Sequence, residues 1–285
     1  MPETFSTKLE RAFTTKGQLC IGIDPHSALV DEAGFVDDAS GVEHFSMTLL
    51  DQVTDHVGII KPQVSFFERF GSKGFAVLER LLSEASNRKL LVIADAKRGD
   101  IGSTMDAYSA AWLTKSAPFI CDGLTVSPYL GFGTLNSAIA EATERGKGLF
   151  VLCATSNPEG RTVQEAIISD KTISESIAQQ AITTNSLSAQ SNSRFGNLGL
   201  VIGATVNRPD LLSALAKQMD RLRAPILAPG FGAQGAKLED LKQIFSELAP
   251  DVICSVSREV LVDGLNNAGR WAANAQTTLR EAPAG

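Results

Sequence analysis

Cysteine and histidine are scarce in this chain of 285 residues, and their scarcity excludes several kinds of site. The four cysteines, at positions 20, 121, 153 and 254, lie far from one another in the sequence. A CxxC redox pair and a zinc knuckle both need closely spaced cysteines, so we expect neither. The three histidines show no metal-ligand spacing, and we therefore predict no bound metal ion.

Long apolar runs and an excess of basic residues are also absent. No apolar run approaches the length that spans a membrane, and the first residues, MPETFSTKLERAF, lack the apolar segment of a signal peptide. The net charge is −6, whereas a general nucleic-acid binder normally carries a basic face. We expect a cytoplasmic protein with no membrane and no nucleic-acid partner. A small anionic substrate is not excluded, because a few local cations can outweigh the overall charge.

Short apolar runs, in contrast, recur along the whole chain. They cover residues 18–24, 56–62, 90–97, 123–128, 148–156, 198–205, 224–230 and 252–258. Their near-continuous apolarity is typical of strands that are buried on both faces, and most of the gaps between them have a helical pattern. Eight strand–helix repeats predict an α/β fold, a (β/α)8 barrel that forms one domain over residues 1–285. The alternative is a doubly wound open sheet, which the lack of a GxGxxG motif after the first run disfavours.

The connection between the fifth and sixth predicted strands is the irregular part of the pattern. It spans about residues 157–197 and is longer than a simple crossover needs. We expect a helix over 168–185, a loop over 186–197, and a helical and loop insertion overall. A further helix is expected over 236–249, where apolar residues follow helical spacing.

Charged residues stand at the ends of the first three apolar runs. Asp24 closes the first run, Lys61 the second, and Asp95 and Lys97 the third. In a parallel barrel the carboxyl ends of all strands meet at one mouth, where barrel enzymes keep their active sites. Asp95 and Lys97 are two residues apart on a strand, so their side chains point to the same side, and Asp100 lies beyond the strand end. We predict a network of alternating charges whose members fix one another's protonation.

Glycines follow the seventh predicted strand, in the segment APGFGAQGA at 228–236, and Arg258 ends the eighth. Glycines let backbone N–H groups approach an anion closely, and a phosphate site after strands seven and eight recurs in barrels. The forked guanidinium of arginine suits such a site. The segment therefore predicts a phosphate-binding loop.

These motifs together resemble the orotidine 5′-phosphate decarboxylase family. The segment IADAKRGDIGST contains Asp-x-Lys-x-x-Asp followed by Ile and by a Thr four residues after the second Asp. The segments GIDP at 22–25 and KPQVSFFE at 61–68, the glycine loop and the strand-eight arginine fall in the expected order. The resemblance covers most of the chain. The KPQVSFFE segment and the chain length resemble the longer bacterial form of the family. It implies a cofactor-free and metal-free lyase that converts the nucleotide orotidine 5′-monophosphate to UMP in pyrimidine biosynthesis.

The resemblance also implies roles for residues at matching positions. Lys97 would protonate C6 of the pyrimidine, Asp95 would lie against the substrate carboxylate, and Ser156 would bind the pyrimidine amide. Asp24 and Lys61 would bind the ribose hydroxyls. The 5′-phosphate would be held by Gln234, Gly235 and Arg258. The residues expected to reach the active site of a second subunit, and so to require a homodimer with shared active sites, are Asp100, Ile101 and Thr104.

Two other functions are compatible with the same residues. A magnesium-dependent sugar-phosphate decarboxylase of the same barrel superfamily would share the Asp-x-Lys-x-x-Asp frame. A catalytically silent barrel that binds a nucleotide would have no reason to keep the proton donor, so the intact charged set disfavours it.

Overall fold

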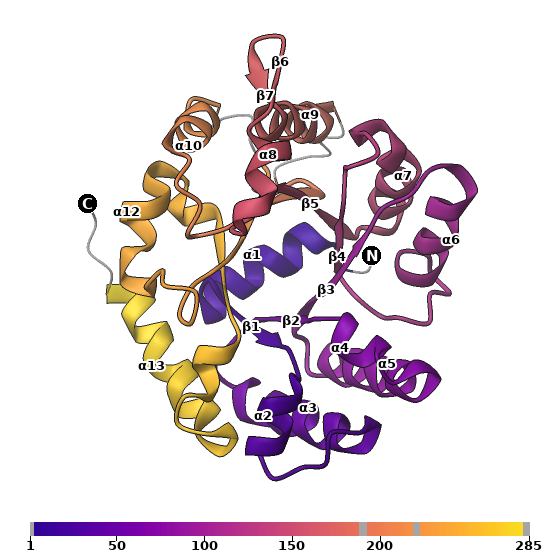
Figure 1. Cartoon of the computed structure of the whole chain (residues 1–285), viewed down its shortest axis with the longest axis vertical. Helices are drawn as coiled ribbons and strands as arrows, with labels where there is room; N and C mark the ends of the chain where they lie inside the picture. Colours follow the sequence, from indigo (N-terminus) through magenta and orange to yellow (C-terminus); the bar gives the residue numbers. More distant parts are fainter. Residues whose placement is uncertain (1–2, 188–192, 219–222, 282–285) are drawn as a thin grey trace.

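Eight parallel strands close into a barrel in the computed structural model of the chain, and this confirms the predicted (β/α)8 fold (Figure 1). The structure describes residues 3–187, 193–218 and 223–281. The barrel strands are β1 (Leu19–Ile23), β2 (Ile59–Pro62), β3 (Leu91–Arg98), β4 (Gly123–Val126), β5 (Gly148–Ala154), β8 (Leu198–Ile202), β9 (Ile226–Pro229) and β10 (Val252–Val256). They follow one another around the barrel in chain order, and β10 pairs with β1 to close it.

Helices surround the barrel on the outside (Figure 1). The α-helices are α1 (Phe5–Lys16), α2 (Ser27–Glu32), α3 (Ala39–Val53), α4 (Ser65–Glu68), α5 (Gly71–Asn87), α6 (Gly102–Trp112), α7 (Asn136–Arg145), α8 (Arg161–Gln164), α9 (Ile173–Leu187), α10 (Pro209–Ala216), α12 (Leu241–Phe245) and α13 (Ala268–Glu281). The 3-10 turns are η1 (Phe132–Leu135), η2 (Pro158–Gly160), η3 (Leu238–Asp240), η4 (Ser246–Asp251), η5 (Arg258–Leu261) and η6 (Leu265–Asn267). Within the described ranges, none of the helices is both long and apolar enough to cross a bilayer.

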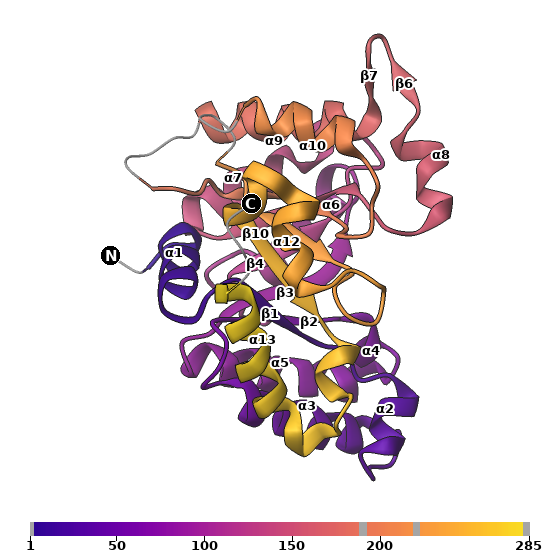
Figure 2. The same ribbon diagram turned by 90° about the vertical axis from the view of Figure 1, so that its left-hand side faces the viewer.

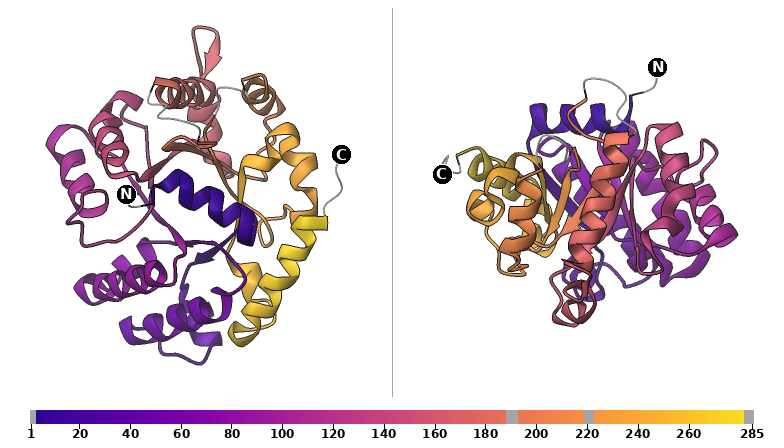
Figure 3. Two further views of the ribbon diagram at one scale, coloured as in Figure 1. Left: turned by 180° about the vertical axis from the view of Figure 1, so that it is seen from behind. Right: turned by 90° about the horizontal axis from the view of Figure 1, so that it is seen from above.

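The apolar residues form two cores. The larger core lies between the strands and the surrounding helices, as expected for strands buried on both faces. The smaller core lies inside the barrel and beneath α1, which crosses one end of the barrel (Figure 3, left). Phe5 of α1 packs edge-to-face on Phe150 of β5, with 5.7 Å between the ring centroids. Helix α1 therefore closes the amino-terminal end of the barrel, and the opposite end is left for a site.

The β5–β8 connection contains the elements that differ most from the sequence prediction. The helix expected from residue 168 begins at Ile173, and residues 168–172 instead belong to a hairpin of β6 (Ile167–Ile168) and β7 (Lys171–Thr172). The backbone N–H of Thr172 donates to the Glu175 carboxylate, and the backbone N–H of Glu175 donates to the Thr172 hydroxyl. This capping arrangement starts a helix at the residue directly after Thr172. Helix α9 packs on β5 and β8 outside the barrel, whereas the hairpin projects outward (Figures 1 and 2). Of the loop predicted over 186–197, residues 188–192 lie outside the described part of the chain.

The helix predicted over 236–249 is wrong as a continuous element. The structure has η3, α12 and η4 in its place, which are three short pieces. Ser246 adopts a left-handed φ of 49°, and Pro250 lies inside η4. A left-handed residue and a proline both interrupt the hydrogen bonding of an α-helix, which explains the break.

Candidate functional site

A cavity of about 930 Å³ opens at the carboxyl ends of the barrel strands. This is the end opposite α1, and the α8 segment lies on the same side of the molecule (Figure 2). Seven of the residues predicted from the sequence line it: Asp24, Lys61, Asp95, Lys97, Ser156, Gln234 and Arg258. Residues from six different barrel strands or the loops after them therefore converge on one cavity.

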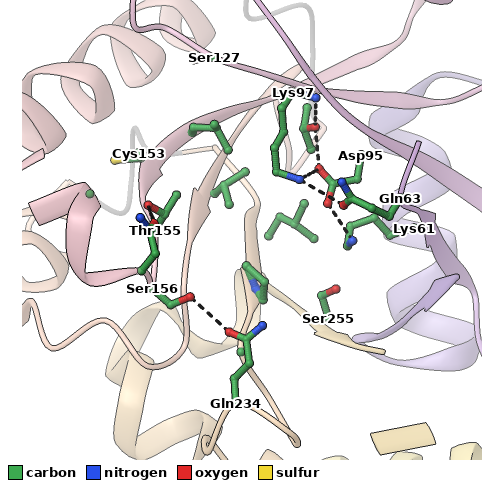
Figure 4. Close-up of a pocket in the computed structure, with 18 of the residues that line it drawn as sticks. Lys61, Gln63, Asp95, Lys97, Ser127, Cys153, Thr155, Ser156, Gln234 and Ser255 are labelled. Atoms are coloured by element: carbon green, nitrogen blue, oxygen red, sulfur yellow. Dashed lines mark hydrogen bonds and ion pairs between the residues drawn. The ribbon is translucent and has the colours of Figure 1, made fainter. Parts of the chain in front are cut away.

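Asp95 forms the centre of a charged group on one wall of the cavity (Figure 4). Its Oδ2 accepts a hydrogen bond from Lys61 Nζ at 2.9 Å, and its Oδ1 accepts one from Lys97 Nζ at 2.7 Å. Lys61 and Asp95 are buried, whereas 45% of the Lys97 side chain is exposed at the cavity. The predicted contact of these three side chains is therefore present in a single chain.

The two buried charges stabilise each other's ionised form. Burial lowers the pKa of Lys61, but the charges of Asp95 and Asp24 raise it by more, so the net shift is upward. Burial raises the pKa of Asp95, and the nearby charges of Lys61 and Lys97 outweigh this and hold it below its ordinary value. At neutral pH the wall therefore presents an ionised carboxylate between two cations.

Two further side chains contact this group, and the sequence analysis assigned them no role. Gln63 Oε1 accepts a hydrogen bond from Lys97 Nζ at 3.1 Å. Thr125 donates its hydroxyl to Asp95 Oδ1 at 2.9 Å and accepts the backbone N–H of Lys97 at 2.9 Å. Gln63 follows Lys61 by two residues, and Thr125 is a polar residue within an apolar run. Those two sequence features were the available signals for them.

Asp24 directly follows β1, the strand that pairs with β2 of Lys61, and its Oδ1 is buried without a hydrogen-bond partner among the described residues. A buried carboxylate oxygen without a donor is unfavourable, because it has lost its water without gaining a bond. It lines the cavity, so a hydroxyl or N–H group of a bound molecule could supply the missing donor.

The opposite wall carries the glycine loop and residues after β5 (Figure 4). Ser156 donates its hydroxyl to Gln234 Oε1 at 3.2 Å. Gly230, Gly232 and Gly235 have φ values of 113°, 76° and 108°, which side chains disfavour, so this loop needs its glycines. Arg258 begins η5 and lines the cavity beside the loop, whereas Gly235 is exposed outside the lining. The two walls together could bind a molecule with an anionic group at one end and a reacting group near Lys97.

Three predicted residues lie apart from the cavity of their own chain. Asp100 accepts a hydrogen bond from the backbone N–H of Ile101, whose side chain is 60% exposed, and Thr104 is exposed at the start of α6. None of them lines the cavity.

A metal site is not evident from the residue types. No group of three or more His, Cys, Asp and Glu side chains within residues 3–187, 193–218 and 223–281 is arranged to hold a metal ion.

Comparison with known proteins gives a consistent result. The family described as "Orotidine 5'-phosphate decarboxylase / HUMPS family" matches residues 17–268. Orotidine 5′-phosphate decarboxylase of Streptomyces coelicolor is 46% identical over 262 residues, which is 92% of this chain and 91% of that protein. The enzyme of the same name from Corynebacterium efficiens is 44% identical over 265 residues, covering 93% and 92%.

A solved structure extends the similarity to three dimensions. A Streptomyces avermitilis protein assigned as an orotidine 5′-phosphate decarboxylase superposes with a TM-score of 0.89 at 42% identity. The match covers 100% of this chain and 97% of that one. The chain therefore belongs to the orotidine 5′-phosphate decarboxylase family.

Proposed function

We propose that the chain removes carbon dioxide from orotidine 5′-monophosphate to form UMP in pyrimidine biosynthesis, without a metal or a cofactor. The observation that carries the proposal is the contact of Lys61, Asp95 and Lys97 on one wall of the cavity, facing a glycine loop and Arg258. The names of the curated relatives, which share 44–46% of their residues with this chain, support the choice of substrate.

Lys97 is the proton donor in this proposal. When the bond between C6 and the carboxylate breaks, its electron pair stays on C6 and carbon dioxide leaves. The ammonium of Lys97 then transfers a proton to C6, which gives UMP and a neutral amine that solvent reprotonates. An ammonium has three N–H donors, and Asp95 and Gln63 occupy two of them, so the third can point at C6. A fixed cation beside the developing charge is the arrangement that stabilises such a transition state.

The other cavity residues bind and orient the nucleotide. Asp95 lies against the substrate carboxylate, and Asp24 and Lys61 bind the ribose hydroxyls. The unpartnered Oδ1 of Asp24 supports this assignment, because a hydroxyl would satisfy it. Ser156 bonds the pyrimidine amide. The 5′-phosphate is bound by Gln234, Gly235 and Arg258, and binding energy from this remote group favours the reaction at C6.

The active enzyme is a homodimer with shared active sites in this proposal. Asp100, Ile101 and Thr104 lie outside the cavity of their own chain, and Ile101 and Thr104 are exposed at the start of α6. These observations support a second subunit into whose cavity the three residues reach.

We place the enzyme in the cytoplasm. The four cysteines are buried and free, which fits a reducing compartment. Burial raises the pKa of the Cys20, Cys121 and Cys153 thiols to about 12, so these thiols stay protonated and unreactive at neutral pH.

An absorbance assay with orotidine 5′-monophosphate tests the proposed reaction. We expect loss of substrate with stoichiometric formation of UMP and carbon dioxide, at the same rate before and after treatment with EDTA. A rate that EDTA abolishes and Mg²⁺ restores would favour a magnesium-dependent sugar-phosphate decarboxylase instead. Binding of UMP without any turnover of the substrate would favour a silent nucleotide-binding barrel.

A further inference from the structure

The ladder between β3 and β4 is interrupted where the reactive residues lie. Ala94 pairs with Leu124, and the next pair is Arg98 with Val126, so four steps along β3 match two steps along β4. Asp95, Ala96 and Lys97 lie in this bulge. A bulge re-aims side chains but leaves backbone groups without their ladder partners.

Lys97 adopts a left-handed backbone conformation inside the bulge, with φ at 49°. The other described non-glycine residues with positive φ lie outside the barrel strands. A side chain disfavours this conformation, and such a residue persists only when its surroundings hold it in place.

Thr125 of β4 supplies that restraint. Its Oγ1 accepts the Lys97 N–H at 2.9 Å and so replaces the acceptor that the bulge removed. The same hydroxyl donates to Asp95 Oδ1 at 2.9 Å, the oxygen that also accepts Lys97 Nζ. Thr125 is 1% exposed, so water does not readily replace either bond.

We propose that Thr125 is a positioning residue, whose single hydroxyl fixes the backbone of Lys97 and the carboxylate of Asp95 relative to each other. This inference rests on the proposed decarboxylation. Because catalysis is sensitive to small displacements of the reacting groups, loss of the hydroxyl should reduce kcat far more than it weakens nucleotide binding. The phosphate site on the opposite wall is unaffected by it.

The test compares kcat, KM and calorimetric UMP binding for Thr125→Val, Thr125→Ser and Thr125→Ala. Thr125→Val should lower kcat roughly 10- to 100-fold with KM and UMP affinity within about threefold of the wild type. Thr125→Ser, which keeps the hydroxyl, should retain most of kcat. If Thr125→Val does not fold, the serine and alanine variants decide, because they differ by one oxygen atom. Thr143→Val in α7 is the matched control and should leave kcat unchanged, since its hydroxyl only bonds Ile139 O within the helix.

Hydrogen exchange of the Lys97 amide separates this inference from the proposed function. We expect the amide to be protected in the wild type and in Thr125→Ser, and to exchange at least about tenfold faster in Thr125→Val. Equal kcat in the serine and alanine variants, or an unchanged amide exchange rate, would overturn the role of Thr125. If the wild-type chain does not decarboxylate the substrate, but the Lys97 amide still exchanges faster in Thr125→Val than in the wild type, only the proposed reaction is refuted.

Discussion

Asp95 is the residue on which the charged wall depends, because both of its oxygens accept a lysine ammonium. Lys61 is buried together with it, and a buried cation without its partner is strongly unfavourable. The same arrangement that is proposed to serve the reaction should therefore also contribute to the stability of the barrel.

Replacing Asp95 with asparagine should destabilise the protein at neutral pH. Removal of one partner of a buried ion pair typically lowers the free energy of unfolding by about 3–5 kcal/mol, because the remaining charge is uncompensated. Urea unfolding at pH 7 measures the difference. Glu43→Gln is the matched control, since Glu43 pairs with Arg80 at the surface and should contribute less than about 1 kcal/mol.

The pH dependence of stability follows from the directions of the two pKa shifts. The lowered pKa of Asp95 contributes stability above its unfolded value near 3.9, and this is lost as the pH falls through the folded value. The raised pKa of Lys61 contributes stability below about 10.4, which is lost as the pH rises through its folded value. The cost of Asp95→Asn should hence be largest between about pH 4 and pH 10 and shrink below that window. A cost that is the same at pH 7 and pH 2.5 would contradict this account.

The sequence predicted the charged residues because their positions follow from strand ends alone. Lys61, Asp95 and Lys97 close neighbouring apolar runs, and neighbouring runs become neighbouring strands. Thr125 and Gln63 were not assigned, because their contacts depend on the β3–β4 bulge and on the reach of the Lys97 side chain to the residue after the neighbouring strand β2. A bulge leaves no clear trace in the pattern of apolar residues.

At the scale of elements, α1 closes the end of the barrel away from the cavity, and Phe5 is its largest buried side chain. Phe5→Ala should lower the free energy of unfolding by about 3–5 kcal/mol, through lost burial and the cavity left against Phe150. Because the cavity lies at the opposite end, kcat of the folded fraction should not change. Urea unfolding and an activity assay on the same samples measure both quantities.

Thr14→Ala is the control for this substitution, because Thr14 is exposed on the same helix. It should change stability by no more than about 0.5 kcal/mol. A loss of kcat in Phe5→Ala that exceeds the loss of folded protein would show that α1 affects the site.

The elements that sequence analysis located well are those with a long, uniform pattern. All eight barrel strands were predicted, since each is an apolar run bounded by turn residues. The hairpin at residues 167–172 was missed because its strands are short and mostly exposed, so burial leaves no periodic pattern there. The capping residues Thr172 and Glu175 were a readable signal for the start of α9, and the sequence analysis did not use it.

At the scale of the whole molecule, the proposed dimer makes a direct prediction. Lys97→Ala and Asp100→Ala subunits should each be inactive alone. When mixed and allowed to exchange, they should recover about one quarter of wild-type activity, because half of the dimers are mixed and each of these has one intact site. The assay follows UMP formation after mixing, and a mixture of each variant with itself is the control.

A monomeric chain in solution, or a mixture that stays inactive although exchange of subunits is shown by mass spectrometry, would contradict the shared active site.

We also infer that the chain is a single barrel domain over its whole length. The hairpin, α8 and the neighbouring turn are elaborations of the fifth crossover in that view.

The central claim is that the Lys97 ammonium protonates C6, and single-turnover kinetics of Lys97→Ala with orotidine 5′-monophosphate test it most directly. The account predicts a folded variant that still binds UMP and forms no detectable product. Near-normal product formation by that variant would contradict the claim, since no other described cation contacts Asp95 from the exposed side of the cavity.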